Sequence, residues 1–184
     1  MATDHGVADP ARYALLALLL QHPAHGYELS RAFAGGSVLA DILHLGQSNV
    51  YALLSRMERD GLVTAAEVEA GDRPTRRVYA LTERGREAVS AWLDATVSHP
   101  RDMRIEFPLK LYLLTRSRPA HALDLIARQR AVFRAYIERL ERTAGEPSGK
   151  DEDFLRLVRV GRHGRAQAAL EWLDAAERVV QARS

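Results

Sequence analysis

Polar side chains able to read a base edge lie close together in the stretch from residue 47 to 55. Gln and Asn can each form two hydrogen bonds with adenine, and Ser can bond to either kind of base edge. Ala52 is small enough to let a helix in this stretch approach its target closely. The stretch therefore predicts base contacts in the major groove of duplex DNA, made by Gln47, Ser48, Asn49, Tyr51 and Ser55.

Arginines near this stretch predict contacts with DNA phosphates. Arg59 falls on the same expected helix face, and Arg73, Arg76 and Arg77 lie in or beside a turn-rich segment between two strand-like runs. Guanidinium groups suit phosphates and narrow minor grooves. Arg59 could instead pair with neighbouring acids, and the other three could form only a charged hairpin edge that prevents pairing with other strands.

Three of the other candidate positions also have a structural alternative. Gln47 and Ser48 could cap the helix rather than contact bases. Tyr51 could pack as core between the helix and the hairpin. These alternatives stay open at the level of sequence.

The helix that carries these residues must be held by its other face. Val50, Leu53, Leu54 and Met57 recur at i, i+3, i+4 and i+7, which places them on one side of a helix. Gly61 follows Asp60 in the usual position after a helix end. The pattern predicts a well-anchored amphipathic helix that ends near Asp60.

The flanking segments predict a winged helix. One helix is expected over 11–20 after Asp9 and Pro10, a second over 25–33 with Tyr27 among its apolar members, and residues 39–45 favour either a helical turn or a short strand. Strand-like runs at 62–68 and 77–81 flank a turn-rich tip at 69–76, and Thr82 is expected to cap a further helix. Three helices, a hairpin and a helix within about 90 residues are typical of a winged helix-turn-helix.

The remainder of the chain predicts long helices. A boundary near His99–Asp102 divides the chain into residues 1–98, a winged-helix DNA-binding domain, and 99–184, a helical dimerisation domain. Apolar residues recur by three and four at Leu123, Ile126, Phe133, Ile137 and Leu140, with Arg130 in the same seam. The final helix repeats the pattern at Phe154, Val158, Gly161, Arg165, Ala168, Trp172, Ala175 and Val179. The fold class expected is mainly α with a small β-hairpin wing, forming a homodimer through the C-terminal helices.

Four aromatic residues raise the possibility of an effector pocket. Trp92, Phe107, Tyr112 and Trp172 could meet where the fourth helix joins the C-terminal helices, and aromatic walls suit a flat apolar ligand. Ordinary core and dimer packing is the alternative for the same residues.

Composition excludes several classes of function. The chain of 184 residues has no cysteine, which excludes disulfides and thiolate sites, and no apolar run reaches the ~18 residues of a membrane helix. No basic leader precedes Asp9, so a cytoplasmic location is expected. Phosphate-loop and nucleophile-elbow motifs are absent, so neither an enzyme nor a cofactor is expected. No metal is expected, because Pro23 breaks helical geometry between His22 and His25 and no thiolate is available. His25 is instead expected near the start of its helix, close to a phosphate.

Charge is distributed unevenly along the chain. The net charge is +2, but residues 1–98 carry more acids than bases. This acidic balance keeps one alternative open, a winged helix that binds only other proteins.

Three segments resemble PadR-type regulators. They are YALLALL at 13–19 with HPAHGYEL at 22–29, VYALLSRMERDGLV at 50–63, and RRVYALTERG at 76–85. The resemblance covers roughly residues 11–98, and the helical remainder is similar to the dimerisation region of the longer subgroup. It implies a homodimeric bacterial regulator, usually a repressor that a small molecule often releases from its operator, with Tyr51, its helix and the wing arginines at the DNA. A symmetric dimer with two recognition helices further predicts an inverted-repeat operator. Residues 46–49, just before Tyr51, differ from the sequence most common in the family.

Overall fold

The computed structural model describes residues 9–70, 73–142 and 151–183, and leaves out the side chains of 68–70 and 73–76. The chain forms two compact units, the first from residues 1–94 with 108–113 and the second from 95–107 with 114–184. The domain division at 98/99 stays a prediction. No sequence signal indicated that residues 108–113 would pack with the first unit.

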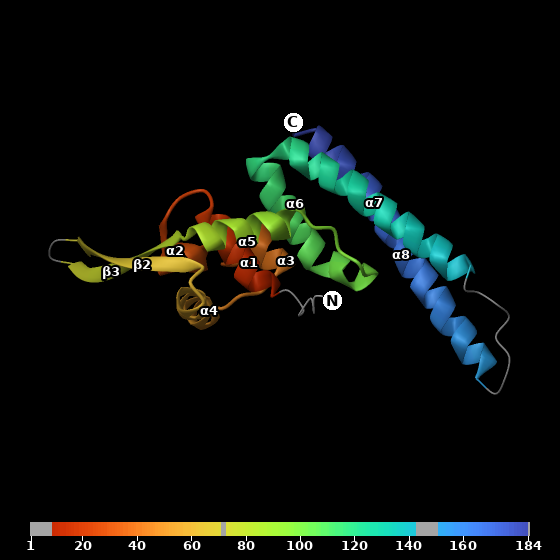
Figure 1. Cartoon of the computed structure of the whole chain (residues 1–184), viewed down its shortest axis with the longest axis horizontal. Coiled ribbons are helices and arrows are strands. Elements are labelled where there is room, and N and C mark those ends of the chain that lie inside the picture. Colours follow the sequence, from red (N-terminus) through yellow and green to blue (C-terminus); the bar gives the residue numbers. More distant parts are fainter. Residues whose placement is uncertain (1–8, 71–72, 143–150, 184) are drawn as a thin grey trace. The chain divides into compact units, whose positions relative to one another are not determined.

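The first unit is a helical bundle with a three-stranded antiparallel sheet, as the expected fold class requires. In the sheet, β3 lies between β1 and β2, with Tyr79 opposite both Ala24 and Ala65. In Figure 1 the β2–β3 hairpin extends beyond the helices of its unit. The elements are α1 (Pro10–Leu19), β1 (Ala24–His25), α2 (Gly26–Arg31), α3 (Val38–Ile42), α4 (Gln47–Arg59), β2 (Val63–Ala70), β3 (Arg73–Leu81) and α5 (Glu83–Asp94).

Local capping signals set the helix starts where the sequence predicts them. The Asp9 carboxylate accepts hydrogen bonds from the backbone N–H groups of Ala11 and Arg12, at 3.1 and 3.4 Å. The Thr82 hydroxyl accepts from the Gly85 N–H at 3.0 Å and donates to the Gly61 carbonyl at 2.7 Å. Thr82 therefore both caps α5 and ties its start to the end of α4.

The hairpin and the short elements correct several sequence predictions. The strands run further into the expected tip, because β2 continues to Ala70 and β3 already begins at Arg73. Backbone pairing does not depend on side-chain polarity, so the turn-forming composition of 69–76 overstated the length of the turn. The two-residue strand β1 was not predicted. Of the two alternatives left open for residues 39–45, the structure has the helical one, α3.

The core of the first unit joins α1, α4 and α5. The Tyr13 and Trp92 rings stack with centroids 5.1 Å apart, and the buried Lys110 ammonium lies 5.0 Å from the Trp92 ring. The α5 backbone approaches the start of β2 so closely that a Cβ at Gly85 would lie 2.0 Å from the Leu62 carbonyl oxygen. These contacts fix the hairpin against the helices that carry it.

The second unit is helical. It contains a 3-10 helix, η1 (Pro100–Arg104), and two long helices, α7 (Pro119–Arg142) and α8 (Glu152–Gln181), which run side by side (Figure 1). The helix α6 (Glu106–Ser117) contributes residues to both units. Arg130 crosses from α7 to Asp174 and Glu177 of α8, at 2.9 and 2.7 Å. Hydrogen bonding to Glu177 contributes most to raising the pKa of Arg130 above its ordinary value.

A buried glutamine fastens the segment before η1 to α7. The Gln129 side chain accepts from the Val97 N–H at 2.7 Å and donates to the Val97 carbonyl at 2.8 Å. This pair satisfies both backbone groups of Val97 inside the protein, where an unpaired group would be costly.

The buried face of α8 differs from the predicted seam. Its C-terminal half buries Ala166, Ala169, Leu173, Ala176 and Val180, each one position after the predicted seam residue. One residue is about 100° of helix rotation. The predicted stripe therefore lies beside the buried one, and Trp172 and Val179 remain exposed in the single chain.

Among the described residues, none of the helices has the length and apolar character needed to cross a membrane.

Candidate nucleic-acid interface

The outer face of α4 presents the predicted base-reading residues to solvent. Val50, Leu54 and Met57 are completely buried and hold the helix by its inner face, while Leu53 is half-buried. The N-cap residue is Gly46, and no side chain caps the helix, so Gln47 and Ser48 do not cap it as the alternative proposed. The predicted DNA-binding residues of α4 are all exposed: Gln47, Ser48, Asn49, Tyr51, Ser55 and Arg59.

Tyr51 lies at the edge of this face against the start of α2. Its side chain is 39% exposed, so it is not a core residue. Its ring packs on Gly26, where a Cβ would lie 2.5 Å from the Tyr51 Cε1 atom. The glycine therefore leaves the space that the ring occupies.

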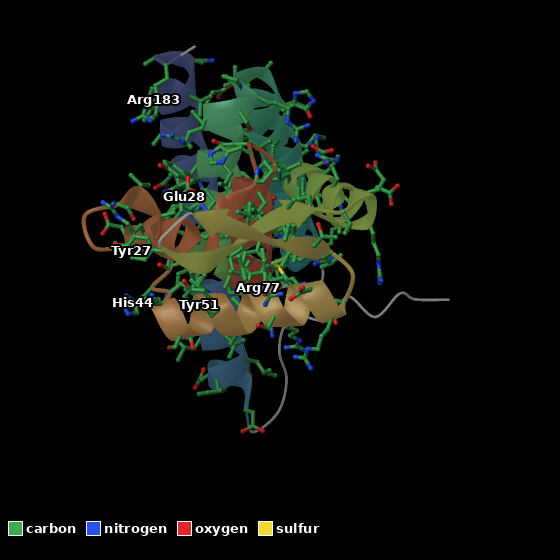
Figure 2. All side chains as sticks on the ribbon, turned by 90° about the vertical axis from the view of Figure 1, so that its left-hand side faces the viewer. Tyr27, Glu28, His44, Tyr51, Arg77 and Arg183 are labelled. Carbon is green, nitrogen blue, oxygen red and sulfur yellow. The ribbon has the colours of Figure 1, made fainter. Side chains whose placement is uncertain are left out.

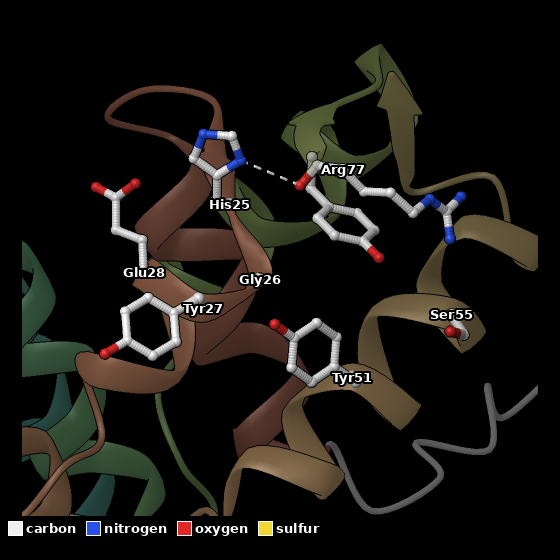
Figure 3. A pocket seen from close by; sticks show the side chains of 8 residues that line it. His25, Gly26, Tyr27, Glu28, Tyr51, Ser55 and Arg77 are labelled. Carbon is white, nitrogen blue, oxygen red and sulfur yellow. Dashed lines mark hydrogen bonds between the residues drawn. The ribbon is translucent and has the colours of Figure 1, made fainter. Parts of the chain in front are cut away.

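A cavity of about 820 Å³ lies beside Tyr51, between α2, α4 and β3 (Figure 3). Tyr27, Tyr51 and Ser55 contribute hydroxyl groups to its lining, and His25 and Arg77 contribute nitrogen donors. Glu28 is the acidic residue of the lining. Hydroxyl, imidazole and guanidinium groups are those that position DNA phosphates, so this lining suits an anionic oxygen.

Tyr27 is a functional candidate that the sequence pattern misplaced. It was expected among the apolar members of its helix, but it is 59% exposed and lies in the region of Tyr51 and Arg77 (Figure 2). A tyrosine satisfies an apolar pattern whichever way it points, and only the packing of α2 against α4 places it at the surface.

Arg77 braces the hairpin against α4. Its Nη2 atom donates to both carboxylate oxygens of Glu58, at 2.8 and 3.0 Å, and its guanidinium lies 5.5 Å from the centre of the Tyr79 ring. Electrostatic interaction with Tyr79, followed by the hydrogen bond that Arg77 donates to Glu58, raises the pKa of Arg77. The Arg77 carbonyl also lies 3.4 Å from His25 Nδ1.

The other predicted arginines differ in what the structure describes of their side chains. Asp60 pairs with Arg12 at 3.0 Å and Glu58 with Arg77, so both acids that could have held Arg59 are occupied. Within the described part of the chain Arg59 forms no ion pair, which leaves it available to a phosphate. Arg73 and Arg76 belong to β3, but their side chains lie outside the described residues.

The predicted effector residues divide between the two units. Trp92 and Tyr112 belong to the first unit, and Trp92 is occupied by Tyr13 and Lys110. Phe107 and Trp172 belong to the second, where their rings meet edge to face at 6.0 Å. The effector pocket stays a prediction.

No group of three or more metal-ligating side chains occurs within residues 9–70, 73–142 and 151–183.

Comparison with known proteins identifies related sequences for both parts of the chain. Residues 15–91 match the Transcriptional regulator PadR-like family, and residues 103–181 match the family described as Virulence activator alpha C-term. A Bacillus subtilis protein named Negative transcriptional regulator PadR is 26% identical over 118 residues, 64% of this chain and 64% of that protein, hence less than two thirds of its length. A Mycobacterium tuberculosis protein named as a probable transcriptional regulator is 27% identical over 184 residues, 92% of this chain and 96% of that one.

Solved structures of related proteins match the chain along most of its length. Bacillus subtilis PadR in complex with operator DNA has a TM-score of 0.46 at 23% identity, covering 92% of this chain and 98% of that one. The complex of the same protein with p-coumaric acid has a TM-score of 0.42 at 22% identity, covering 94% and 99%. The match of residues 15–91 spans the described helices and hairpin from within α1 to within α5, and it identifies this part of the chain as a domain of the PadR-like family of transcriptional regulators.

Proposed function

We propose that this protein is a cytoplasmic, sequence-specific DNA-binding repressor that acts as a homodimer on an inverted-repeat operator. The observation that carries the proposal is the exposed polar face of α4, held by a fully buried apolar face and flanked by the Tyr51 cavity. A helix docked in the major groove needs both properties, because rigidity fixes its register and short polar side chains reach the bases.

The proposed residue roles follow from the side-chain chemistry. Gln47, Ser48, Asn49 and Ser55 are proposed to read base edges, and Arg59 to contact a phosphate. Tyr51, predicted above as a base contact, is instead proposed to contact a phosphate, because it lines the cavity that suits an anionic oxygen. Arg73 and Arg76 are proposed to contact phosphates from the hairpin. Arg77 is proposed to hold the hairpin against α4 through Glu58, in addition to any contact with DNA.

An unfilled apolar stripe on α8 supports dimer formation. One face of this helix packs on α7. A second, neighbouring stripe carries large apolar side chains that stay exposed in the single chain. Its exposed large members are Phe154, Leu157, Trp172 and Val179. Exposed apolar stripes of this kind mark association surfaces, and a two-fold dimer places two α4 helices on two half-sites about one DNA turn apart.

Repression is proposed because the Bacillus subtilis relative is named a negative regulator. A small aromatic effector is proposed to release the repressor from DNA. The candidate effector residues are Trp92 and Tyr112 of the first unit and Phe107 and Trp172 of the second. Such an effector must bind the released conformation better than the DNA-bound one, or it shifts nothing. No catalytic activity is proposed.

The test is fluorescence anisotropy of the full-length protein with duplex from upstream of its own gene, compared with scrambled duplex across a salt series. A phosphate-contacting protein shows a linear fall of log affinity with log salt, and a sequence-reading one prefers the upstream duplex. Failure to bind either duplex at low salt would instead favour the alternative, a winged helix that contacts only other proteins.

A further inference from the structure

A second cavity lies entirely within the second unit. It occupies about 590 Å³ where η1 and the segment before it meet α7 and α8, which is within the range of about 300–1,000 Å³ that small-molecule sites have. The described residues that line it include no Asp or Glu. Its polar lining consists of His99, Arg101, Tyr136, Arg139, Arg162 and Arg165.

Four guanidinium groups from three elements therefore face one space. Arginine remains protonated at all ordinary pH values, so cations gathered in this way repel one another unless an anion lies between them. Asp102 offsets Arg101 at a distance of 3.6 Å. Arg162 and Arg165 form no ion pair within the described part of the chain, which leaves an excess of positive charge on the α8 side.

The nearby carboxylates of α7 are directed to other partners. Glu138 lies 3.9 Å from Arg142, and Glu141 lies 3.6 Å from His163. Neither carboxylate pairs with Arg162 or Arg165, so these two α7 acids do not neutralise the α8 side of the cavity.

The local geometry also places the cationic groups. Arg165 folds back over Gly161, where a Cβ would lie 3.4 Å from Arg165 Nη1. A Cβ at that distance would make an ordinary van der Waals contact, so the guanidinium lies close against the α8 backbone at Gly161. Arg139 lies over the Tyr136 ring at 5.2 Å, so the cavity offers an aromatic wall beside its charges.

We propose that this cavity binds a small organic polyanion whose charged groups are phosphates or carboxylates. Guanidinium groups bind both through paired hydrogen bonds. Because the lining comes from η1, α7 and α8, such a ligand would tie the three elements together. The proposal does not depend on DNA binding by α4.

The experiment is isothermal titration calorimetry of the full-length protein with sodium pyrophosphate and, separately, with sodium citrate, each against sodium chloride of equal ionic strength. Saturable binding of one anion per chain is expected. Pyrophosphate binding more tightly would identify a phosphate ligand, and citrate binding more tightly a carboxylate ligand.

The test variant is Arg162→Gln with Arg165→Gln, which should weaken binding at least tenfold. Glutamine keeps good helix propensity, and both positions are exposed, so the fold should persist, as circular dichroism will verify. The matched control is Arg178→Gln with Arg183→Gln, which removes the same charge from exposed positions outside the cavity and should leave affinity within twofold.

Three results would overturn the proposal. One is the absence of saturable binding by either anion at matched ionic strength. The second is equal loss of affinity in the test and control variants, which would indicate a general charge effect. The third combines two observations: the wild type binds neither small anion, and the test variant loses affinity for duplex DNA. That result would assign Arg162 and Arg165 to operator binding.

Discussion

The Tyr51 ring and the backbone of Gly26 occupy adjoining space, and this contact sets the position of the tyrosine hydroxyl. The tyrosine belongs to α4 and the glycine to the first residue of α2. The sequence indicated each residue by its motif, but their contact follows from the packing of α2 on α4. A change at Gly26 can therefore act on DNA binding through Tyr51.

Gly26→Ala is expected to weaken operator binding about tenfold, which corresponds to about 1.4 kcal/mol. The added Cβ would lie 2.5 Å from Tyr51 Cε1, so the ring must move. Gly35→Ala is the matched control, because nothing lies within 4 Å of its Cβ position. Anisotropy titrations compare the two variants with wild type. Equal operator affinity in all three proteins would show that the position of Tyr51 does not matter for binding.

Glu58→Gln is expected to tighten DNA binding severalfold at low salt. The change removes a negative charge from the C-terminal turn of α4 and loosens the hold on the Arg77 guanidinium, which donates two hydrogen bonds to Glu58. The pair is partly exposed, so its loss should change the free energy of unfolding by less than about 1 kcal/mol. Glu87→Gln, at an exposed position on α5, is the control for charge alone. The experiment is the same salt series, and weaker binding of the Glu58 variant would show that bracing Arg77 outweighs freeing it.

At the scale of elements, the sequence predicted the features that local signals determine and missed those that depend on long-range contacts. The apolar spacing of Val50, Leu54 and Met57 defined α4, because one helix face must be buried whatever surrounds it. Thr82 identified the start of α5 because capping is local. In contrast, β1 has only two residues, and pairing with β3 alone creates it.

Long-range partners account for the other differences. Gln129 reads as an ordinary polar helix residue, and only its distance from Val97 in the fold makes it a buried clamp. Likewise α8 carries two neighbouring apolar stripes. The spacing by three and four predicted only the stripe through Trp172 and Val179, whereas contact with α7 buries the neighbouring one.

Replacing glycine by alanine should have opposite effects on stability at two positions, Gly85 in α5 and Gly164 in α8. Gly85→Ala would put a Cβ 2.0 Å from the Leu62 carbonyl oxygen, so the backbone must shift. Overpacking of this kind costs roughly 1–3 kcal/mol. Gly164→Ala meets nothing within 4 Å and should stabilise the protein by up to about 1 kcal/mol, because alanine is the better helix former. Urea unfolding measures both, and a stable Gly85 variant would mean that α5 is not held as closely as the structure has it.

At the scale of the whole molecule, the exposed stripe of α8 is expected to carry the dimer. The double variant Leu157→Glu with Val179→Glu places two charges on that stripe, where association would have to desolvate them. We expect a monomer at micromolar concentration, measured by light scattering. Operator affinity should fall at least tenfold, because two half-sites are no longer bound by one particle.

The control variant is Gln167→Glu with Gln181→Glu, which adds the same charge at exposed positions of α8 away from the stripe. It should remain a dimer with operator affinity close to wild type. If both variants dimerise, association must use another surface, and the apolar stripe of α8 requires a different partner. If the stripe variant is monomeric yet binds the full operator as tightly as wild type, DNA recognition requires a single winged helix, and the inverted-repeat operator is wrong.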